Sequence, residues 1–199
     1  MRRENWHKIV EAALPPARWQ HTVRVQETAV KLAKKIGIES EYAIQAALLH
    51  DYCKYWSRKE LATWITRCHL PVELLQFHKE LWHGPVGAEV AREQFGVEEV
   101  DVLNAIRYHT SGRPGMSLLE KVIFLADYIE PGRRFPGVEE VRVQAEGSLD
   151  LAVMSALRNT VQFLLQQQQK VYPLTLLAYN DLYDQLSEDE RKNCKEESH

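Results

Sequence analysis

Histidine and aspartate side chains, both able to bind a metal ion, recur along this chain inside or beside apolar helical segments. The clearest case is the His50–Asp51 pair in the stretch AALLHDYCKYW, residues 46–56. Burying an ionised carboxylate is costly unless a positive group pairs with it. A metal ion is one such partner. Lys54, one helical turn from His50, is another, so the pair alone leaves a structural ion pair and a metal site both open.

Three further histidines and one more aspartate decide between these alternatives. They stand within or at the ends of apolar helices, and they are His21 in RWQH, His83 in WHGPVGAEV, His109 in AIRYHTSG and Asp127 in VIFLADYIEP. Imidazole and carboxylate ligands without thiolates suit Fe, Mn, Ni, Zn or Mg, and helical bundles assemble metal sites from several helices. We therefore favour a metal site centred on His50 and Asp51.

The segments that would carry these residues are predicted to be helices. Apolar residues recur at three- and four-residue spacing while alternating strand-like runs are scarce, so the chain is predicted to be all-α. The predicted helices cover about residues 6–14, a stretch from Pro16 to about 36, 40–51, 85–95, 98–109, 149–169 and 174–186, with one more containing Asp127. Between them, GRRFPG at 132–137 is predicted to be irregular.

Local signals set several of these boundaries. Gly37 is a predicted C-terminal stop, and Ser40 is predicted to cap the helix that carries His50 and Asp51. Two capping-box patterns predict further helix starts, Ser57 with Glu60 and Ser117 with Glu120.

Length and composition indicate one compact domain. The 199 residues contain no linker rich in Gly, Pro or Ser, so we predict a domain over 1–186 and a charged, disordered tail over 187–199.

The 25 Lys and Arg against 28 Asp and Glu give a net charge of −3, which argues against non-specific binding to nucleic acid or anionic membranes. Without a long apolar run or a secretory signal, we expect a cytoplasmic protein. The three cysteines form no CxxC pair and suggest neither disulfides nor a thiolate zinc site.

The order of His21, His50–Asp51 and Asp127 resembles the H…HD…D pattern of the HD superfamily of metal-dependent phosphohydrolases. Three motifs, LLHDYCK, HGPVGA and YHTSGRPGMSLLEKVIFLADYIEPGR, resemble those of the bacterial YqeK family, and the likeness covers about residues 18 to 175. This resemblance implies an all-α HD-domain bundle with a bound iron. The implied activity is that of a symmetrical bis(5'-nucleosyl)-tetraphosphatase, which hydrolyses diadenosine tetraphosphate to two ADP.

The same resemblance assigns roles to residues that match the family pattern. As metal ligands it implies His21, His50, Asp51 and Asp127. It gives His83 and His109 one of two roles, either as ligands of a second metal ion or as contacts of substrate phosphate. The predicted catalytic residues are Asp51, Lys54, His83 and His109.

A tetraphosphate is strongly anionic, so its pocket needs cations beyond the metal ion, which would activate water and neutralise phosphoryl charge. Arg18 and Lys54 share helical faces with predicted ligands, and Arg133 closely follows the Asp127 helix. The predicted substrate contacts are Arg18, Lys54, His83, His109, Thr110, Arg133, Lys170, Tyr172 and Thr175, with Arg24 a further candidate. Tyr172, in KVYPLT, is predicted to stack on adenine.

Several of these residues could have a structural role instead of a functional one. Any single arginine could form a surface ion pair worth about 0–1 kcal/mol. His7, His69, His78 and His199 match no motif and are predicted to be surface or cap residues. His78 is a rival to His83, which we prefer because a helix starts directly after it at Gly84-Pro85 and because HGPVGA matches the family. Trp19, Trp56, Trp64 and Trp82 are predicted to pack in the core or at its rim.

Two other functions remain open from the sequence. The same metal core could serve a nucleotidase or phosphodiesterase acting on another nucleotide. A non-catalytic module that binds a nucleoside diphosphate, ADP or GDP, is the second alternative. Iron is the favoured metal, with Mn, Ni, Mg and Zn open, as are one or two ions and a monomer or a homodimer. Neither nucleic acid nor a membrane is an expected partner.

Overall fold

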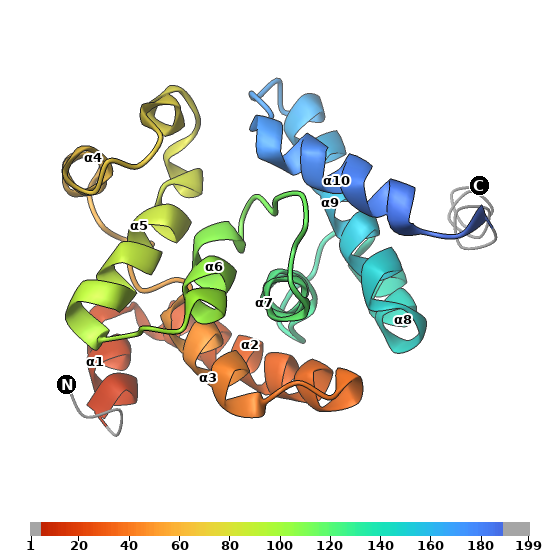
Figure 1. Ribbon diagram of the computed structural model, residues 1–199, viewed down its shortest axis with the longest axis horizontal. Coiled ribbons are helices and arrows are strands. Elements are labelled where there is room, and N and C mark those ends of the chain that lie inside the picture. The colour runs from red at the N-terminus through yellow and green to blue at the C-terminus, as the bar shows by residue number, and fades with distance from the viewer. Residues whose placement is uncertain (1–4, 189–199) are drawn as a thin grey trace.

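The computed structural model describes residues 5–188, and this range contains helices and turns but no β-strand (Figure 1). In chain order the elements are α1 (Trp6–Ala13), α2 (Pro16–Ile36), α3 (Ser40–Leu49), α4 (Arg58–Arg67), the 3-10 helices η2 (Val72–Gln76) and η3 (Lys79–Leu81), α5 (His83–Val90), the π-helical turn η4 (Ala91–Phe95), α6 (Val100–Tyr108), α7 (Leu118–Ile129), α8 (Val138–Gly147), α9 (Leu149–Gln166) and α10 (Pro173–Gln185). The predicted all-α, single-domain architecture is confirmed.

Helix α7 is the centre of the fold. It packs against α2, α3, α6, α8 and α9, and Figure 1 shows it nearly end-on with α2 and α3 on one side and α8 to α10 on another. The run from Val122 to Ala126 is apolar and buried on every side. A helix that is apolar all round must be enclosed by others. Asp127, one residue beyond this run, therefore lies where several helices meet.

Most predicted boundaries are confirmed. Helix α2 starts at Pro16 and ends before Gly37, whose φ of 75° is the left-handed conformation that terminates a helix. The Ser57–Glu60 capping box is fully formed at the start of α4. At the start of α7, the Ser117 hydroxyl accepts the Glu120 backbone N–H as predicted.

The start and the end of α3 differ from the prediction. Glu39 occupies the N-cap and Ser40 is the first helical residue, so Ser40 does not cap the helix. The helix ends at Leu49, which places Asp51 in the turns that follow. There the Lys54 N–H donates to the Asp51 carbonyl over 2.9 Å, a three-residue spacing that tightens the chain. Lys54 is therefore positioned by a turn rather than by α-helical spacing.

Two other segments were predicted incompletely. Helix α8 was not predicted, although its buried stripe of Val138, Val141 and Ala145 packs against α9 and α7. The stripe is narrow and interrupted by charged residues, so its apolar period is weak. The irregular GRRFPG directly before it gives no clear signal for the start of a helix. The predicted 85–95 helix begins at His83 and widens into the π-helical turn, while α9 ends at Gln166.

Among residues 5–188, no helix has the length and apolar content needed to cross a membrane. The predicted tail falls mostly on residues outside the described range. Its disorder and the domain limit at 186 therefore stay predictions.

Candidate metal centre

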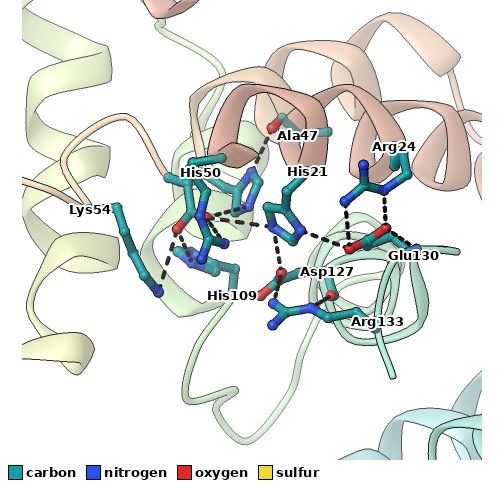
Figure 2. Close-up of polar contacts among 12 residues, drawn as sticks. His21, Arg24, Ala47, His50, Lys54, His109, Asp127, Glu130 and Arg133 are labelled. Carbon is teal, nitrogen blue, oxygen red and sulfur yellow. Dashed lines mark hydrogen bonds and ion pairs between the residues drawn. The ribbon is translucent and has the colours of Figure 1, made fainter. Parts of the chain in front are cut away.

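Four of the predicted metal ligands converge beside α7, and Figure 2 shows three of them, His21, His50 and Asp127, close together. His21 comes from α2, His50 and Asp51 lie just past α3, and Asp127 comes from α7. The Nε2 atom of His21 lies 3.0 Å from Asp127 Oδ1 and 3.6 Å from Asp51 Oδ2, and His50 Nε2 lies 3.3 Å from the same Asp51 oxygen. Ligand atoms of His21, His50 and Asp127 all lie within 4.8 Å of one another, close enough to share one ion.

Asp51 also faces a second pair of histidines through its other carboxylate oxygen. His83 Nε2 lies 3.0 Å from Asp51 Oδ1 and 3.0 Å from His109 Nε2, and His109 Nε2 lies 3.8 Å from that same carboxylate oxygen. His50, Asp51 and His109 form a second group whose ligand atoms lie within 4.8 Å of one another. The two oxygens of Asp51 thus point to two different histidine pairs, which is the geometry of a bridging carboxylate.

The hydrogen bonds of three histidines leave one ring nitrogen directed at the cluster. In His50, Nδ1 lies 2.6 Å from the Ala47 carbonyl, and in His109 it lies 2.7 Å from the Ile106 carbonyl. A carbonyl oxygen can only accept, so Nδ1 carries the proton and Nε2 offers a lone pair. His21 Nδ1 likewise faces a carboxylate oxygen of Glu130.

Several of the atoms directed at the cluster are buried without a hydrogen-bond partner in the part of the chain that the structure describes. They are His21 Nε2, His50 Nε2 and Asp51 Oδ1. A buried polar atom left unsatisfied costs about 1–3 kcal/mol. A divalent metal ion accepts lone pairs from all three atoms, so these residues fit a metal site.

Electrostatics favour the metal-binding forms of most of these groups. Burial lowers the pKa of His83, and burial together with the neighbouring His83 and His50 holds the pKa of His109 well below its usual value. Burial opposes ionisation of Asp51, but His50 and His83 outweigh it and keep the pKa of that carboxyl well below its usual range. Asp51 in turn overcomes burial and raises the pKa of His50, so a bound ion must displace a proton there.

The three cations predicted to bind phosphate border the cluster, and each pairs with a predicted ligand. Arg18 Nη1 lies 2.9 Å from Asp51 Oδ2, and Arg133 Nη2 lies 2.5 Å from Asp127 Oδ1. Lys54 Nζ lies 3.8 Å from Asp51 Oδ1 and 3.0 Å from a carboxylate oxygen of Glu80. Their side chains are 20%, 32% and 21% exposed, so all three reach both the cluster and solvent.

The remaining predicted substrate contacts are less closely connected to the cluster. Thr110 Oγ1 is buried without a hydrogen-bond partner among residues 5–188, directly after His109. Lys170 Nζ donates to the Gln76 carbonyl over 3.4 Å, and Tyr172 packs edge-on against Phe77 with ring centroids 5.0 Å apart. Thr175 is buried in the first turn of α10. These contacts join the α9–α10 connection to the 3-10 segment, and the substrate roles stay predictions.

Other histidines behave as surface or cap residues, as predicted. His78 accepts the Glu80 backbone N–H through Nδ1 and caps η3, which supports the choice of His83 over His78. His7 contacts Gln26 at an exposed position. His199 lies outside the described residues.

One residue close to the cluster was not predicted to have a role. Glu130, three residues after Asp127 and therefore on the same helical face, is buried and contacts His21 and Arg24. Burial opposes its ionisation, but hydrogen bonds from Arg24, His21 and the Gly132 N–H outweigh this and lower the pKa of Glu130 to about 2. The motif DYIEPGR contained the signal for this residue.

Gly84 allows α5 and α6 to approach closely enough for His83 and His109 to meet. A Cβ at this position would lie 2.9 Å from the Arg107 carbonyl oxygen and 3.2 Å from that of Ile106. We expect Gly84→Ala to lower the free energy of unfolding by about 1–3 kcal/mol through overpacking. Displacing His83 by about 1 Å would also reduce turnover by about 10²-fold. Denaturant unfolding and steady-state kinetics measure the two effects.

Gly147→Ala is the matched control for this substitution. A Cβ on Gly147, the last residue of α8, meets no atom within 4 Å. We expect its stability and activity to stay close to those of the unsubstituted protein. Equal losses in both variants would contradict the role assigned to the α5–α6 approach.

This chain is similar to known proteins both in sequence and in structure. The HD domain family matches residues 18–132, a range that contains all six histidines and aspartates of the cluster. The chain is 49% identical over 180 residues to the symmetrical bis(5'-nucleosyl)-tetraphosphatase of Bacillus subtilis, covering 90% of this chain and 97% of that protein. It is 50% identical over 182 residues to the protein of the same name from Halalkalibacterium halodurans, covering 92% and 97%.

The structural likeness extends over the same length. A crystal structure of a predicted HD superfamily hydrolase involved in NAD metabolism, from Clostridium acetobutylicum, superposes with a TM-score of 0.89. The sequences are 35% identical, and the match covers 94% of this chain and 99% of that one. The similarity therefore includes the whole helical arrangement that brings the cluster together.

Proposed function

Because this chain belongs to the HD-domain family, we propose that it is a metal-dependent symmetrical bis(5'-nucleosyl)-tetraphosphatase that hydrolyses diadenosine tetraphosphate to two ADP. Relatives with this activity in their names align with it over 97% of their length at about half identity. The observation that carries the proposal is the convergence of His21, His50, Asp51 and Asp127 beside three partly exposed cations.

In this proposal His21, His50, Asp51 and Asp127 hold a divalent ion. His83 and His109 hold a second ion together with Asp51 Oδ1, and the division of the Asp51 oxygens between two histidine pairs supports this arrangement. Iron is the proposed metal because the family resemblance implies it, and imidazole and carboxylate donors without thiolates suit iron as they suit Mn, Ni, Zn or Mg. Metal content after purification under anaerobic conditions measures both the identity and the number of ions.

A bound divalent ion supplies a Lewis acid for phosphoryl oxygens and lowers the pKa of water bound to it. The chain itself supplies positioning and charge. Arg18, Lys54 and Arg133 donate to phosphoryl oxygens that enter between them, because their guanidinium and ammonium groups already border the cluster. Figure 2 shows Lys54 and Arg133 on opposite sides of the ligands. A polyphosphate crossing the cluster therefore meets positive charge on both sides.

His109 and its neighbour Thr110 are proposed to take part in binding the metal ion and the substrate as uncharged groups. The lowered pKa of His109, caused first by burial and then by His83 and His50, keeps its imidazole neutral near pH 7. In the proposal the Thr110 hydroxyl donates to a phosphoryl oxygen, a contact that would satisfy its buried oxygen. Lys170, Tyr172 and Thr175 are proposed to contact a nucleoside of the substrate.

ADP or GDP is the expected product-like ligand of the protein. Its cytoplasmic location, the absence of nucleic-acid binding and its oligomeric state stay predictions.

A substrate panel tests the proposal against its alternatives. Protein loaded with Fe²⁺ or Mn²⁺ is expected to show its highest kcat/KM with diadenosine tetraphosphate, compared with AMP, cyclic AMP and short RNA. A higher kcat/KM with a mononucleotide or a phosphodiester would favour the nucleotidase or phosphodiesterase alternative. Tight ADP binding without turnover under any metal would favour a non-catalytic binding module.

A further inference from the structure

We propose that Glu130 is the positioning residue for His21, fixing the tautomer and the orientation with which this imidazole presents Nε2 to the metal. Arg24 and the turn at 130–133 hold Glu130 in place. The inference rests on the proposed function, because it concerns a ligand of the proposed metal site.

The carboxylate of Glu130 is fully occupied by donors (Figure 2). One oxygen, Oε1, lies 3.0 Å from His21 Nδ1 and accepts from Arg24 Nη2 over 3.3 Å. The other, Oε2, accepts from Arg24 Nε and from the Gly132 backbone N–H, each over 2.5 Å. The Glu130 side chain is 2% exposed. Fixed from several directions, the carboxylate has a single position relative to His21.

An ionised carboxylate can accept a hydrogen bond but cannot donate one. His21 must therefore carry its proton on Nδ1, and its Nε2 lone pair faces Asp127 and Asp51. A carboxylate behind an imidazole also makes the imidazole a stronger metal ligand. Without Glu130, the His21 ring could adopt the other tautomer or rotate away from the cluster.

The turn that follows Glu130 links this contact to a second ligand. Arg133 binds both the side chain and the carbonyl of Asp127. Arg142 of α8 donates to the carbonyls of Ile129, Glu130 and Arg133, over 2.9, 2.7 and 3.0 Å. One short turn, held in place by α8, thus positions His21 through Glu130 and Asp127 through Arg133.

Gly132 is part of the same arrangement. A Cβ at this position would lie 2.7 Å from Arg24 Cζ, far inside van der Waals contact. The absence of a side chain lets the Arg24 guanidinium lie against the turn and reach both oxygens of Glu130. Arg24, a further candidate for a substrate contact, therefore also holds Glu130 in place.

A purely structural ion pair is the competing explanation, and the chain offers a matched example of one. Glu120, which lies on α7, is 1% exposed and accepts from Arg113 Nε over 2.9 Å and Nη2 over 2.6 Å. Its carboxylate accepts from Arg113, and its backbone N–H donates to the Ser117 hydroxyl, so it contacts no predicted ligand. Replacing each glutamate by glutamine removes a buried, arginine-paired carboxylate, but Glu130→Gln also alters His21.

The test compares Mn²⁺ binding by Glu130→Gln, Glu120→Gln and the unsubstituted protein, measured by chelator competition without nucleotide. We expect Glu130→Gln to weaken the affinity of a Mn²⁺ site by about 10–100-fold, the usual effect of losing a partner behind a metal ligand. Glu120→Gln is expected to retain the affinity of the unsubstituted protein. Because no nucleotide is present, the result does not depend on whether the protein hydrolyses diadenosine tetraphosphate.

A double variant separates metal affinity from folding. In Glu130→Gln the new amide N–H₂ can face the donors of Arg24, which could destabilise the protein by itself. Arg24→Met/Glu130→Gln removes this donor–donor contact, so we expect it to melt close to Arg24→Met while binding Mn²⁺ as weakly as Glu130→Gln. Affinity of the double variant close to that of the unsubstituted protein would overturn the inference.

The tautomer of His21 gives a readout that a structural role would not change. In the Zn²⁺-loaded protein, long-range ¹⁵N–¹H spectra are expected to show His21 protonated at Nδ1 alone. In Glu130→Gln we expect this proton signal to shift or to exchange faster with water, whereas in Glu120→Gln it stays unchanged. An unchanged His21 signal and unchanged Mn²⁺ affinity in Glu130→Gln would show that Glu130 serves the fold and not the ligand.

Discussion

An Asp51→Ala protein is expected to lose its bound metal and about 10³-fold or more of its kcat/KM with diadenosine tetraphosphate. Asp51 faces His21 and His50 through one oxygen and His83 and His109 through the other, so its removal affects both halves of the cluster. Metal stabilisation of developing charge provides several kcal/mol, and each 1.36 kcal/mol corresponds to tenfold in rate. Metal analysis by mass spectrometry and initial-rate kinetics measure the two losses together.

A matched buried carboxylate controls for the general effect of the substitution. Glu89 is buried and pairs with Arg107 and Arg92 at the opposite end of α5 from His83. We expect Glu89→Gln to lower stability while leaving metal content and kcat/KM close to those of the unsubstituted protein. Full turnover by a metal-free Asp51→Ala protein would refute the ligand assignment.

Lys54→Met is expected to lower kcat by about 10²–10³-fold while the protein keeps its metal. The ammonium group lies 3.8 Å from Asp51 Oδ1 without being a metal ligand, and its partial exposure lets it reach a phosphoryl oxygen. Losing one preorganised donor to developing negative charge has an effect of this size. The methionine side chain preserves the aliphatic packing of the lysine, so the loss of charge is the main change. Steady-state kinetics on protein of known metal content measures the effect.

Glu80→Gln tests whether Lys54 is merely part of a structural ion pair. Glu80 is the nearer carboxylate, 3.0 Å from Lys54 Nζ, and its side chain is 47% exposed. If the pair were structural, both substitutions would have similar effects on stability and neither would affect kcat specifically. We expect Glu80→Gln to retain most of kcat because Lys54 keeps its charge and its position beside Asp51. Equal losses of kcat in the two variants would contradict the phosphate role of Lys54.

Much of the architecture and the family were predictable from local patterns. The three- and four-residue apolar spacing predicts an all-α chain, and proline, glycine and capping-box positions predict the ends of α2 and the start of α4. The H…HD…D order predicted membership of the HD family, which the comparisons confirm. These features depend on residues close together in sequence or on motif order, both of which a single sequence records.

Contacts between distant segments were the features that the sequence did not reveal. Lys54 pairs with Glu80 because an irregular segment with two 3-10 helices returns to the cluster, and 3-10 turns have no strong apolar period. Tyr172 packs against Phe77 across a much longer separation in the sequence. Glu130 was closer to being predictable, since its spacing from Asp127 places both on one helical face. Its contacts with His21 and Arg24 on α2, however, depend on how α7 packs against α2, which the sequence does not record.

The most direct test of the central claim is the product analysis of diadenosine tetraphosphate hydrolysis by metal-loaded and metal-stripped protein. We predict that protein loaded with Fe²⁺ or Mn²⁺ releases two ADP per substrate. Chelator-treated protein should release none until metal is restored. The formation of ATP plus AMP, or undiminished hydrolysis after the metal is removed, would contradict the account.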